Sequence, residues 1–254
     1  MRFGTKAALA AALAVFFLGG VGLRADSPKP ETVEFPNGKE MLSGYVAVPE
    51  KPGRFPGIIV IHSWLGLDDW TKEQTEKIAQ QGFVALAIDL YHGKAPKDLD
   101  EAQELLSGQP PEHSITDMLA AYNYLITRKD VDRDRVGTIG WGMGGTYALQ
   151  LAMHNQRIGA CVVNYGTPPT DPNDIQTIFA QILGNFGGAD RGTTPADVAS
   201  FEKVLKNLGR TVDLKIYDGV GNGFENPNNA KTYDEEAAAD AWARTVKFLN
   251  KALK

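Results

Sequence analysis

Hydrophobic residues along the chain follow two different periods, which predict strands and helices in alternation. Segments with alternating apolar and polar residues predict edge strands at 32–35 and 42–48, with Gly38 in the turn between them. Apolar runs predict further strands, and those at 57–62 and 83–89 are unbroken, as expected of central parallel strands covered on both faces. The remaining strands are expected at residues 136–139, 160–165, 178–183 and 212–217.

Between these apolar runs, hydrophobic residues recur with the spacing of an α-helix. Helices are predicted at residues 71–81, 114–129, 194–209 and 234–252. Ser114, Thr194 and Asp234 are the candidate N-caps, because their side-chain oxygens can accept hydrogen bonds from the free amides of a first turn. The order of strands and helices predicts an α/β protein with a doubly wound, mostly parallel sheet and helices on both faces. One domain is expected, over residues 26–254.

The first 25 residues follow a different pattern. Arg2 and Lys6 precede an apolar run at residues 7–21, and Ala25 follows at a position suited to cleavage. This arrangement is typical of a secretory signal peptide, and the apolar run is shorter than a comfortable membrane span. Residues 1–25 are therefore predicted to be a cleaved signal that directs the chain to the periplasm or out of the cell, with an uncleaved anchor as the alternative. Residues 27–30 are expected to form a short linker.

The charge balance argues against two classes of partner. The chain of 254 residues has a formal net charge of −5. Residues 1–25 carry three positive and no negative side chains, so their removal changes the charge to −8 (−5 minus 3). Such a surface disfavours nucleic acid and, after signal cleavage, membranes as partners. The single cysteine, Cys161, excludes an internal disulfide and is expected to pack in the core.

A glycine-rich turn near the middle of the chain is the strongest candidate for a functional site. After a β-branched run it reads Gly140-Trp141-Gly142-Met143-Gly144-Gly145, and a helix follows. This outline is typical of a nucleophile elbow, in which glycines let a strained turn raise one side chain above the sheet. Gly142 stands at that position, so the turn carries no nucleophile.

The same glycines permit a second interpretation. Gly140, Gly142 and Gly145 match the dinucleotide-binding pattern G-x-G-x-x-G between a strand and a helix. That pattern belongs to the first strand–helix turn of its domain and needs an acidic residue at the end of the next strand. Here the turn comes late, and the next strand offers only Asn164. The sequence therefore indicates no cofactor.

Further motifs follow in order over nearly the whole mature chain. They are His62-Ser63-Trp64-Leu65-Gly66-Leu67, Asp89-Leu90-Tyr91, the turn at 140–145, Gly184-Asn185-Phe186-Gly187-Gly188-Ala189-Asp190, Tyr217-Asp218-Gly219-Val220-Gly221-Asn222-Gly223-Phe224, Asn226-Pro227 with Tyr233, and Ala241-Trp242-Ala243-Arg244-Thr245. Together they resemble the dienelactone hydrolase family. This resemblance implies the α/β-hydrolase fold.

The resemblance also implies site positions. Members of this family resemble one another in a cysteine or serine nucleophile, a histidine and an aspartate, with a glutamate that holds the resting thiol. In this sequence the nucleophile position is Gly142, the histidine position is Asn222 and the glutamate position is Ser63. Asp190 alone is retained, and it is expected to accept a hydrogen bond from the Asn222 amide.

These substitutions change the expected chemistry. Triad hydrolysis requires a nucleophile and a titratable base, and neither glycine nor an asparagine amide supplies one. The resemblance assigns the oxyanion hole to backbone N–H groups of Met143 and Trp64, which survive side-chain replacement. We therefore predict that the site binds a small carboxylate, lactone or ester without efficient triad hydrolysis. The expected ligand contacts are Trp64, Met143, Ser63, Tyr91 and Trp141.

Two alternatives remain open. An active ester or lactone hydrolase could recruit Ser63 as nucleophile and His92 as base, although His62 is expected to bond loop backbone and His92 to be a solvated loop residue. An interaction protein would be indicated by a pocket filled with its own side chains. His113 and His154 are isolated in the sequence, so no metal-ligand cluster is predicted. The oligomeric state is left open.

Overall fold

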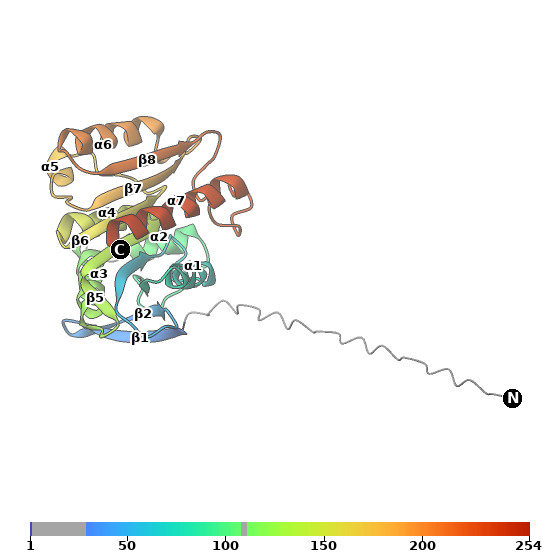
Figure 1. The fold of residues 1–254 in the computed structure, drawn as a ribbon. Coiled ribbons are helices and arrows are strands. Elements are labelled where there is room, and N and C mark those ends of the chain that lie inside the picture. The colour runs from blue at the N-terminus through green and yellow to red at the C-terminus, as the bar shows by residue number, and fades with distance from the viewer. Residues whose placement is uncertain (2–28, 108–110) are drawn as a thin grey trace.

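Eight strands form one sheet in the order β1-β2-β4-β3-β5-β6-β7-β8 in a computed structural model of the chain (Figure 1). The structure describes Met1 and residues 29–107 and 111–254. The strands are β1 (Lys29–Asn37), β2 (Glu40–Val48), β3 (Phe55–Ile61), β4 (Val84–Ile88), β5 (Val131–Trp141), β6 (Ile158–Asn164), β7 (Gln181–Gly187) and β8 (Val212–Tyr217). β2 pairs antiparallel with β1 and β4, and the other pairs are parallel. The predicted mostly parallel sheet is confirmed.

Helices cover both faces of this sheet. They are α1 (Asp69–Gln80), α2 (Leu99–Ser107), α3 (Pro111–Thr127), α4 (Met143–His154), α5 (Pro172–Ile175), α6 (Pro195–Asn207) and α7 (Glu235–Leu253). In the central strand β3, Ile59 and Ile61 belong to the core shared with α3, α4 and α6. Ile58 and Val60 belong to the core shared with α1 and α7. Successive strand residues thus bury opposite faces, which explains the unbroken hydrophobic runs.

The caps of two helices agree with the sequence and one does not. The Thr194 hydroxyl accepts from the Asp197 amide, and the Asp197 carboxylate accepts from the Thr194 amide. These two hydrogen bonds form a capping box at the start of α6. The Asp234 side chain caps α7 by accepting from the Ala237 amide. Ser114, in contrast, lies inside α3, because that helix begins at Pro111. A proline suits a first helical position, where its missing N–H group has no intrahelical acceptor.

Other boundaries also differ from the sequence prediction. Lys29 and Pro30 belong to β1 rather than to a linker. Strand β7 begins at Gln181, three residues after the expected start. Helix α2 was not predicted. Cys161 is fully buried in β6 as expected, and burial raises the pKa of its thiol, which makes it unreactive.

The predicted signal peptide at residues 1–25 lies outside the described residues, apart from Met1. Among the residues that the structure does describe, none of the helices has the length and apolar character needed to cross a membrane.

Candidate functional site

The turn between β5 and α4 has the strained backbone of a nucleophile elbow. Gly142 has φ 55° and ψ −119°, a conformation outside the regions that residues with a Cβ prefer. A Cβ on Gly140 would lie 2.0 Å from the Gly144 carbonyl oxygen, and one on Gly144 would lie 2.2 Å from that of Ile61. These glycines therefore let α4 begin directly against the backbone of β3.

Two loops distant in sequence converge on Gly142. A Cβ at this position would lie 3.1 Å from Ser63 Oγ and 3.9 Å from Asn222 Oδ1. Ser63 follows β3 and Asn222 follows β8, so both come from loops at the carboxyl ends of parallel strands. This is the edge at which α/β proteins bind ligands. The structure thus brings together the nucleophile, glutamate and histidine positions that the sequence identified.

Asp190 fixes the orientation of Asn222. The Asn222 amide donates to Asp190 Oδ2 at 2.8 Å and to the Tyr165 carbonyl oxygen at 3.1 Å. Asp190 Oδ1 accepts from the amides of Gly192, at 2.8 Å, and Thr193, at 3.3 Å. The expected hydrogen bond between Asn222 and Asp190 is confirmed. Because the Asn222 amide does not titrate, it cannot exchange a proton through this contact as a histidine would.

Tyr91 holds together the two residues expected to form the oxyanion hole. Its hydroxyl donates to the Trp64 carbonyl oxygen at 2.8 Å and contacts Met143 Sδ at 3.6 Å. Met143 is the first residue of α4, so its amide has no intrahelical acceptor. Tyr91 is fully buried, and this burial raises the pKa of its hydroxyl. Tyr91 therefore remains a neutral donor that positions the loop after β3 against α4.

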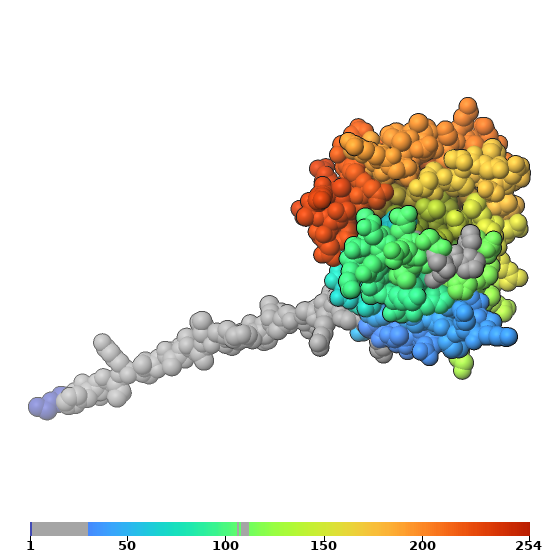
Figure 2. All heavy atoms as spheres, turned by 180° about the vertical axis from the view of Figure 1, so that it is seen from behind, coloured from blue at the N-terminus to red at the C-terminus, as the bar shows by residue number. Residues whose placement is uncertain are grey.

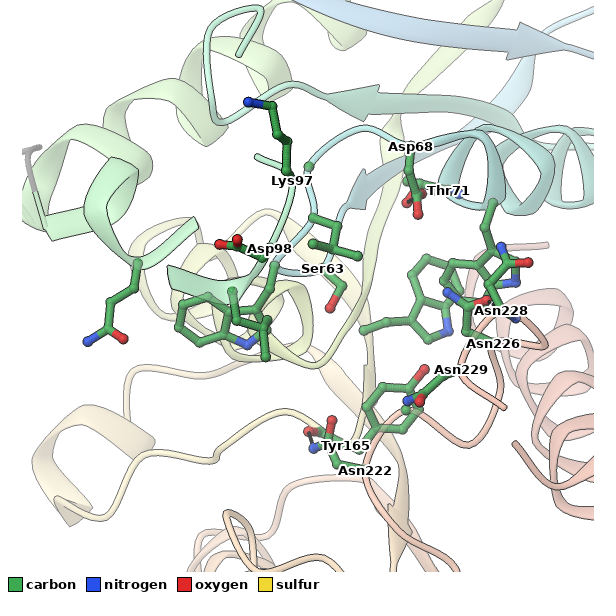
Figure 3. A pocket seen from close by; sticks show the side chains of 18 of the residues that line it. Ser63, Asp68, Thr71, Lys97, Asp98, Tyr165, Asn222, Asn226, Asn228 and Asn229 are labelled. Carbon is green, nitrogen blue, oxygen red and sulfur yellow. Dashed lines mark hydrogen bonds between the residues drawn. The ribbon is translucent and has the colours of Figure 1, made fainter. Parts of the chain in front are cut away.

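A cavity of about 910 Å³ opens beside these residues (Figure 3). Of the expected ligand contacts, Ser63, Trp64 and Trp141 line it. The side chains of Tyr91 and Met143 do not line it and are buried against each other, so a ligand contact from Met143 would come from its backbone amide. The cavity is open rather than filled by the protein's own aromatic side chains, which argues against a pure interaction protein.

Several lining residues were missed from the sequence. Trp70 and Tyr165 add aromatic surface, and the edge of Trp70 packs on Trp141 with ring centroids 5.1 Å apart. Figure 3 shows Lys97 and Asp98 on one side of Ser63 and a group of asparagines on the other. These asparagines are Asn226, Asn228 and Asn229. The run Asn226-Pro227-Asn228-Asn229, which begins four residues after the histidine position, was the available signal.

The rim of the cavity carries more negative than positive side chains. Asp68, Asp98 and Asp100 line it together with Lys97. Asp68 accepts from the Thr71 amide at the start of α1, and Asp98 accepts from the amide of Glu101 in α2. These two carboxylates therefore act as helix caps at the mouth of the cavity.

Glu225 lies behind Trp141 and carries a perturbed carboxyl group. The Trp141 indole N–H donates to Glu225 Oε2 at 3.1 Å. Loss of solvent around the carboxyl raises the pKa of Glu225 to about 8, and the Trp141 hydrogen bond opposes that rise. Glu225 is thus a group that stays largely protonated at neutral pH, and it supports the wall of the cavity.

The histidines considered for recruitment are held elsewhere. His62 is buried, and its Nε2 accepts from the Leu90 amide at 3.1 Å, so Nδ1 carries the proton and donates to the Ser63 carbonyl oxygen at 2.7 Å. Burial also lowers the pKa of His62. The expected backbone role of His62 is confirmed. His154, exposed on α4, contacts the Gln150 carbonyl oxygen at 2.9 Å.

His92 and His113 correct the sequence prediction. His92 Nε2 lies 2.8 Å from Asp117 Oδ2, so this partly exposed loop residue is bound to a buried carboxylate rather than freely solvated, and it is absent from the cavity lining. Its ring stacks on His113 with centroids 5.2 Å apart. His113 is therefore not isolated. The sequence could not reveal this contact, because the two histidines belong to different elements.

The chain is similar to known proteins over most of its length. The sequence model described as the dienelactone hydrolase family matches residues 42–253. Protein usf of Aquifex pyrophilus is 32% identical over 230 residues, covering 88% of this chain and 99% of that protein. A probable 2-oxo-3-(5-oxofuran-2-ylidene)propanoate lactonase of Bradyrhizobium sp is 31% identical, with 84% and 90% covered. A putative carboxymethylenebutenolidase of Methylorubrum extorquens is 28% identical, with 84% and 77% covered.

Solved structures share the fold. A dienelactone hydrolase-like promiscuous phosphotriesterase from metagenomic libraries matches with a TM-score of 0.83 at 22% identity, covering 90% of this chain and 100% of that one. A putative dienelactone hydrolase from Klebsiella pneumoniae matches with a TM-score of 0.80 at 22% identity, covering 89% and 99%. The α/β-hydrolase fold expected from the motifs is confirmed.

Proposed function

Because the chain belongs to the dienelactone hydrolase family, we propose that it is an exported member that binds a small lactone, ester or carboxylate without efficient triad hydrolysis. The observation that carries this proposal is the set of side chains around Gly142. A nucleophile at this position would meet Ser63 and Asn222, yet the turn holds glycine and the histidine position holds an amide. The open cavity beside the turn leaves room for a ligand.

The backbone supports binding without turnover. Helix α4 begins at Met143, directly after Gly142, and the free amides of a helix N-terminus favour a polarised carbonyl or carboxylate oxygen. Tyr91 keeps the Trp64 loop in place for the second donor. In a serine protease, binding and the oxyanion hole alone leave a rate about 10³- to 10⁴-fold above water when the triad is lost. We therefore expect trace hydrolysis at most.

The rim favours neutral ligands. Three carboxylates and one lysine at the mouth give an excess of negative charge, which repels free acids over short distances. The relatives include a probable lactonase whose named substrate carries both a furanone ring and a propanoate group. Matched butenolide lactones with a free carboxylate or its methyl ester form the appropriate panel. We expect the methyl ester to bind more tightly.

The test compares the native chain with a variant in which the triad is restored. Hydrolysis of activated phenyl esters and small lactones should lie near background for the native chain. Gly142→Cys with Asn222→His should raise turnover by at least about 100-fold, because the new histidine can bond Asp190 as Asn222 does. The same variant with Asp190→Asn is the control and should lose most of this gain. Enzyme-like turnover by the native chain would overturn the proposal.

An active hydrolase with recruited residues is the second candidate. It is favoured by Ser63, whose hydroxyl lies beside the vacant nucleophile position and lines the cavity. Its weakness is the base, because His62 and His92 are bound to Leu90, Ser63 and Asp117. Ser63→Ala separates the two candidates. Loss of native turnover in this variant supports recruitment, and unchanged background rates exclude it.

Export is tested on the chain itself. After expression in a bacterium, we expect the periplasmic protein to begin at Asp26 by mass spectrometry. Leu13→Arg places a charge in the apolar run and should leave the full-length chain in the cytoplasm. Lys6→Arg keeps the positive charge and should be processed normally. A full-length native chain recovered from membranes would support the uncleaved anchor instead.

A further inference from the structure

A cluster of two histidines and one aspartate lies outside the cavity described above. His92 follows β4, whereas His113 and Asp117 lie four residues apart on α3 and so share one helix face. The cluster borders the hairpin of β1 and β2, whose residues Asn37 and Glu40 contact it. Figure 2 shows the face on which the green segments of α2 and α3 border this blue hairpin. Three segments distant in sequence therefore meet at one point.

The ligand-type atoms of this cluster have separations close to those around a metal ion. His92 Nε2 lies 2.8 Å and His113 Nδ1 lies 4.0 Å from Asp117 Oδ2. One ligand atom from each of the three residues can be chosen with all separations within 4.8 Å. Zinc bonds to nitrogen and oxygen measure about 2.0–2.2 Å, so two ligands of a tetrahedral ion lie roughly 3.3–3.5 Å apart. Rotation of the two imidazoles out of their stacked arrangement would bring the three atoms to that spacing.

Neighbouring groups orient the cluster in the way metal ligands are oriented. Asp117 Oδ1 accepts from the Asn37 amide at 2.7 Å, which leaves Oδ2 directed at the histidines. His113 Nε2 lies 3.5 Å from Glu40 Oε2, so its other nitrogen, Nδ1, faces Asp117. A histidine that ligates a metal commonly donates its second N–H to a carboxylate. Glu40 occupies that place.

Burial strengthens the case for a bound cation. The Asp117 side chain is fully buried, and a buried carboxylate is costly unless a positive charge or hydrogen-bond donors compensate it. A divalent ion bound between the carboxylate and the two imidazoles would supply that compensation. Both histidine side chains keep partial exposure, so an ion could enter from solvent and retain a water ligand.

We propose that His92, His113 and Asp117 bind one divalent transition-metal ion, with Zn²⁺ the best match to two imidazoles and one carboxylate. Asn37 and Glu40 act as positioning residues for these ligands. The ion would join α3, the loop after β4 and the β1–β2 hairpin, so its role is to tie these segments together. This site is independent of the proposed ligand cavity and of any hydrolysis there.

The test is a titration of the full, tag-free chain with Zn²⁺ after treatment with a chelator. Calorimetry is expected to give one ion per chain with micromolar or tighter affinity. Titration with Co²⁺ should give a visible absorption band of the intensity typical of four or five ligands. Zn²⁺ should also raise the thermal unfolding midpoint, because it binds the folded state.

Matched variants locate the ion. His113→Gln is the primary variant, because His113 is partly exposed on a helix and its replacement leaves the core intact. It should weaken Zn²⁺ binding at least about 10-fold, and Glu40→Gln should weaken it about 10-fold while the ligands remain. His154→Gln, another helical histidine, should leave affinity unchanged.

Two results would overturn the proposal. One is failure of the native chain to bind Zn²⁺ or Co²⁺ in the micromolar range. The other is binding that His113→Gln and Asp117→Asn leave unaltered, since the ion would then lie elsewhere. The cluster would in either case be a hydrogen-bonded pair of His92 and Asp117 stacked on His113.

Discussion

The backbone at Gly142 makes a direct prediction about stability. With φ 55° and ψ −119°, this residue adopts a conformation that a side chain makes costly. Gly142→Ser should therefore lower the free energy of unfolding by about 1 kcal/mol or more, measured by urea denaturation. A nucleophile in this turn would carry the same cost, so its loss stabilises the fold. An unchanged or raised midpoint would mean that the turn is not strained.

Two controls divide the cost at Gly142 into its parts. Adding Ser63→Ala removes the hydroxyl that lies 3.1 Å from the new Cβ, so any recovery in the double variant measures crowding alone. Gly38→Ala tests a left-handed glycine at φ 63° in a hairpin turn, where a Cβ meets no atom within 4 Å. We expect Gly142→Ser to lower the free energy of unfolding more than Gly38→Ala does. The reason is that Gly142 combines a positive φ with a ψ of −119°, which lies outside the left-handed helical region.

At the residue scale the sequence located the site but not the direction of every side chain. The order of the motifs predicted that Gly142, Asn222 and Asp190 lie in loops after parallel strands. Because these strands end at one edge of the sheet, the three residues lie close together. Tyr91 and Met143 were expected to contact ligand, yet their side chains contact each other and do not line the cavity. Whether a loop residue faces the cavity or the core depends on packing between distant segments, which one sequence does not specify.

At the element scale, the loop after β3 and the start of α4 depend on one hydroxyl. Tyr91→Phe removes the hydrogen bond to the Trp64 carbonyl oxygen and leaves that acceptor without its donor. We expect the free energy of unfolding to fall by about 1 kcal/mol. In the background of Gly142→Cys with Asn222→His, kcat should fall about 10-fold, because one oxyanion donor becomes mobile.

A second tyrosine provides the matched control for this prediction. The Tyr45 hydroxyl donates to Glu76 at 2.5 Å and links β2 to α1, away from the elbow. Tyr45→Phe should reduce stability to a similar extent but leave kcat of the restored variant unchanged. Equal losses of kcat in both variants would mean that Tyr91 acts only through general stability.

The elements themselves were predictable where local signals agree. The capping residue and proline at the start of α6 and the hydrophobic run of β3 both identified their elements. The start of α3 was missed, because Ser114 offered a cap inside a helix that Pro111 had already begun. The histidine cluster was missed for a different reason. His92 and His113 are joined by the packing of α3 on the sheet, which no local pattern encodes.

For the whole molecule, the raised pKa of the Glu225 carboxyl predicts how the free energy of unfolding depends on pH. The pKa of its carboxyl is about 8 in the folded chain and near 4.3 in an unfolded one. Between these values the folded state binds more protons, so the free energy of unfolding decreases as pH rises from about 5 to 8. His62 acts in the opposite sense, because burial lowers its pKa and unfolding then takes up a proton below about pH 6.5.

Glu225→Gln isolates the carboxyl from the other titrating groups. Glutamine keeps an acceptor for the Trp141 indole N–H but has no charge to desolvate. Urea unfolding at pH 5.5 and 8.5 should show that the stability of the variant relative to the native chain increases at the higher pH, by about 3 kcal/mol. His62 cancels in this difference because both proteins contain it. Parallel pH profiles would mean that Glu225 ionises normally, and its carboxylate would then be solvated behind Trp141.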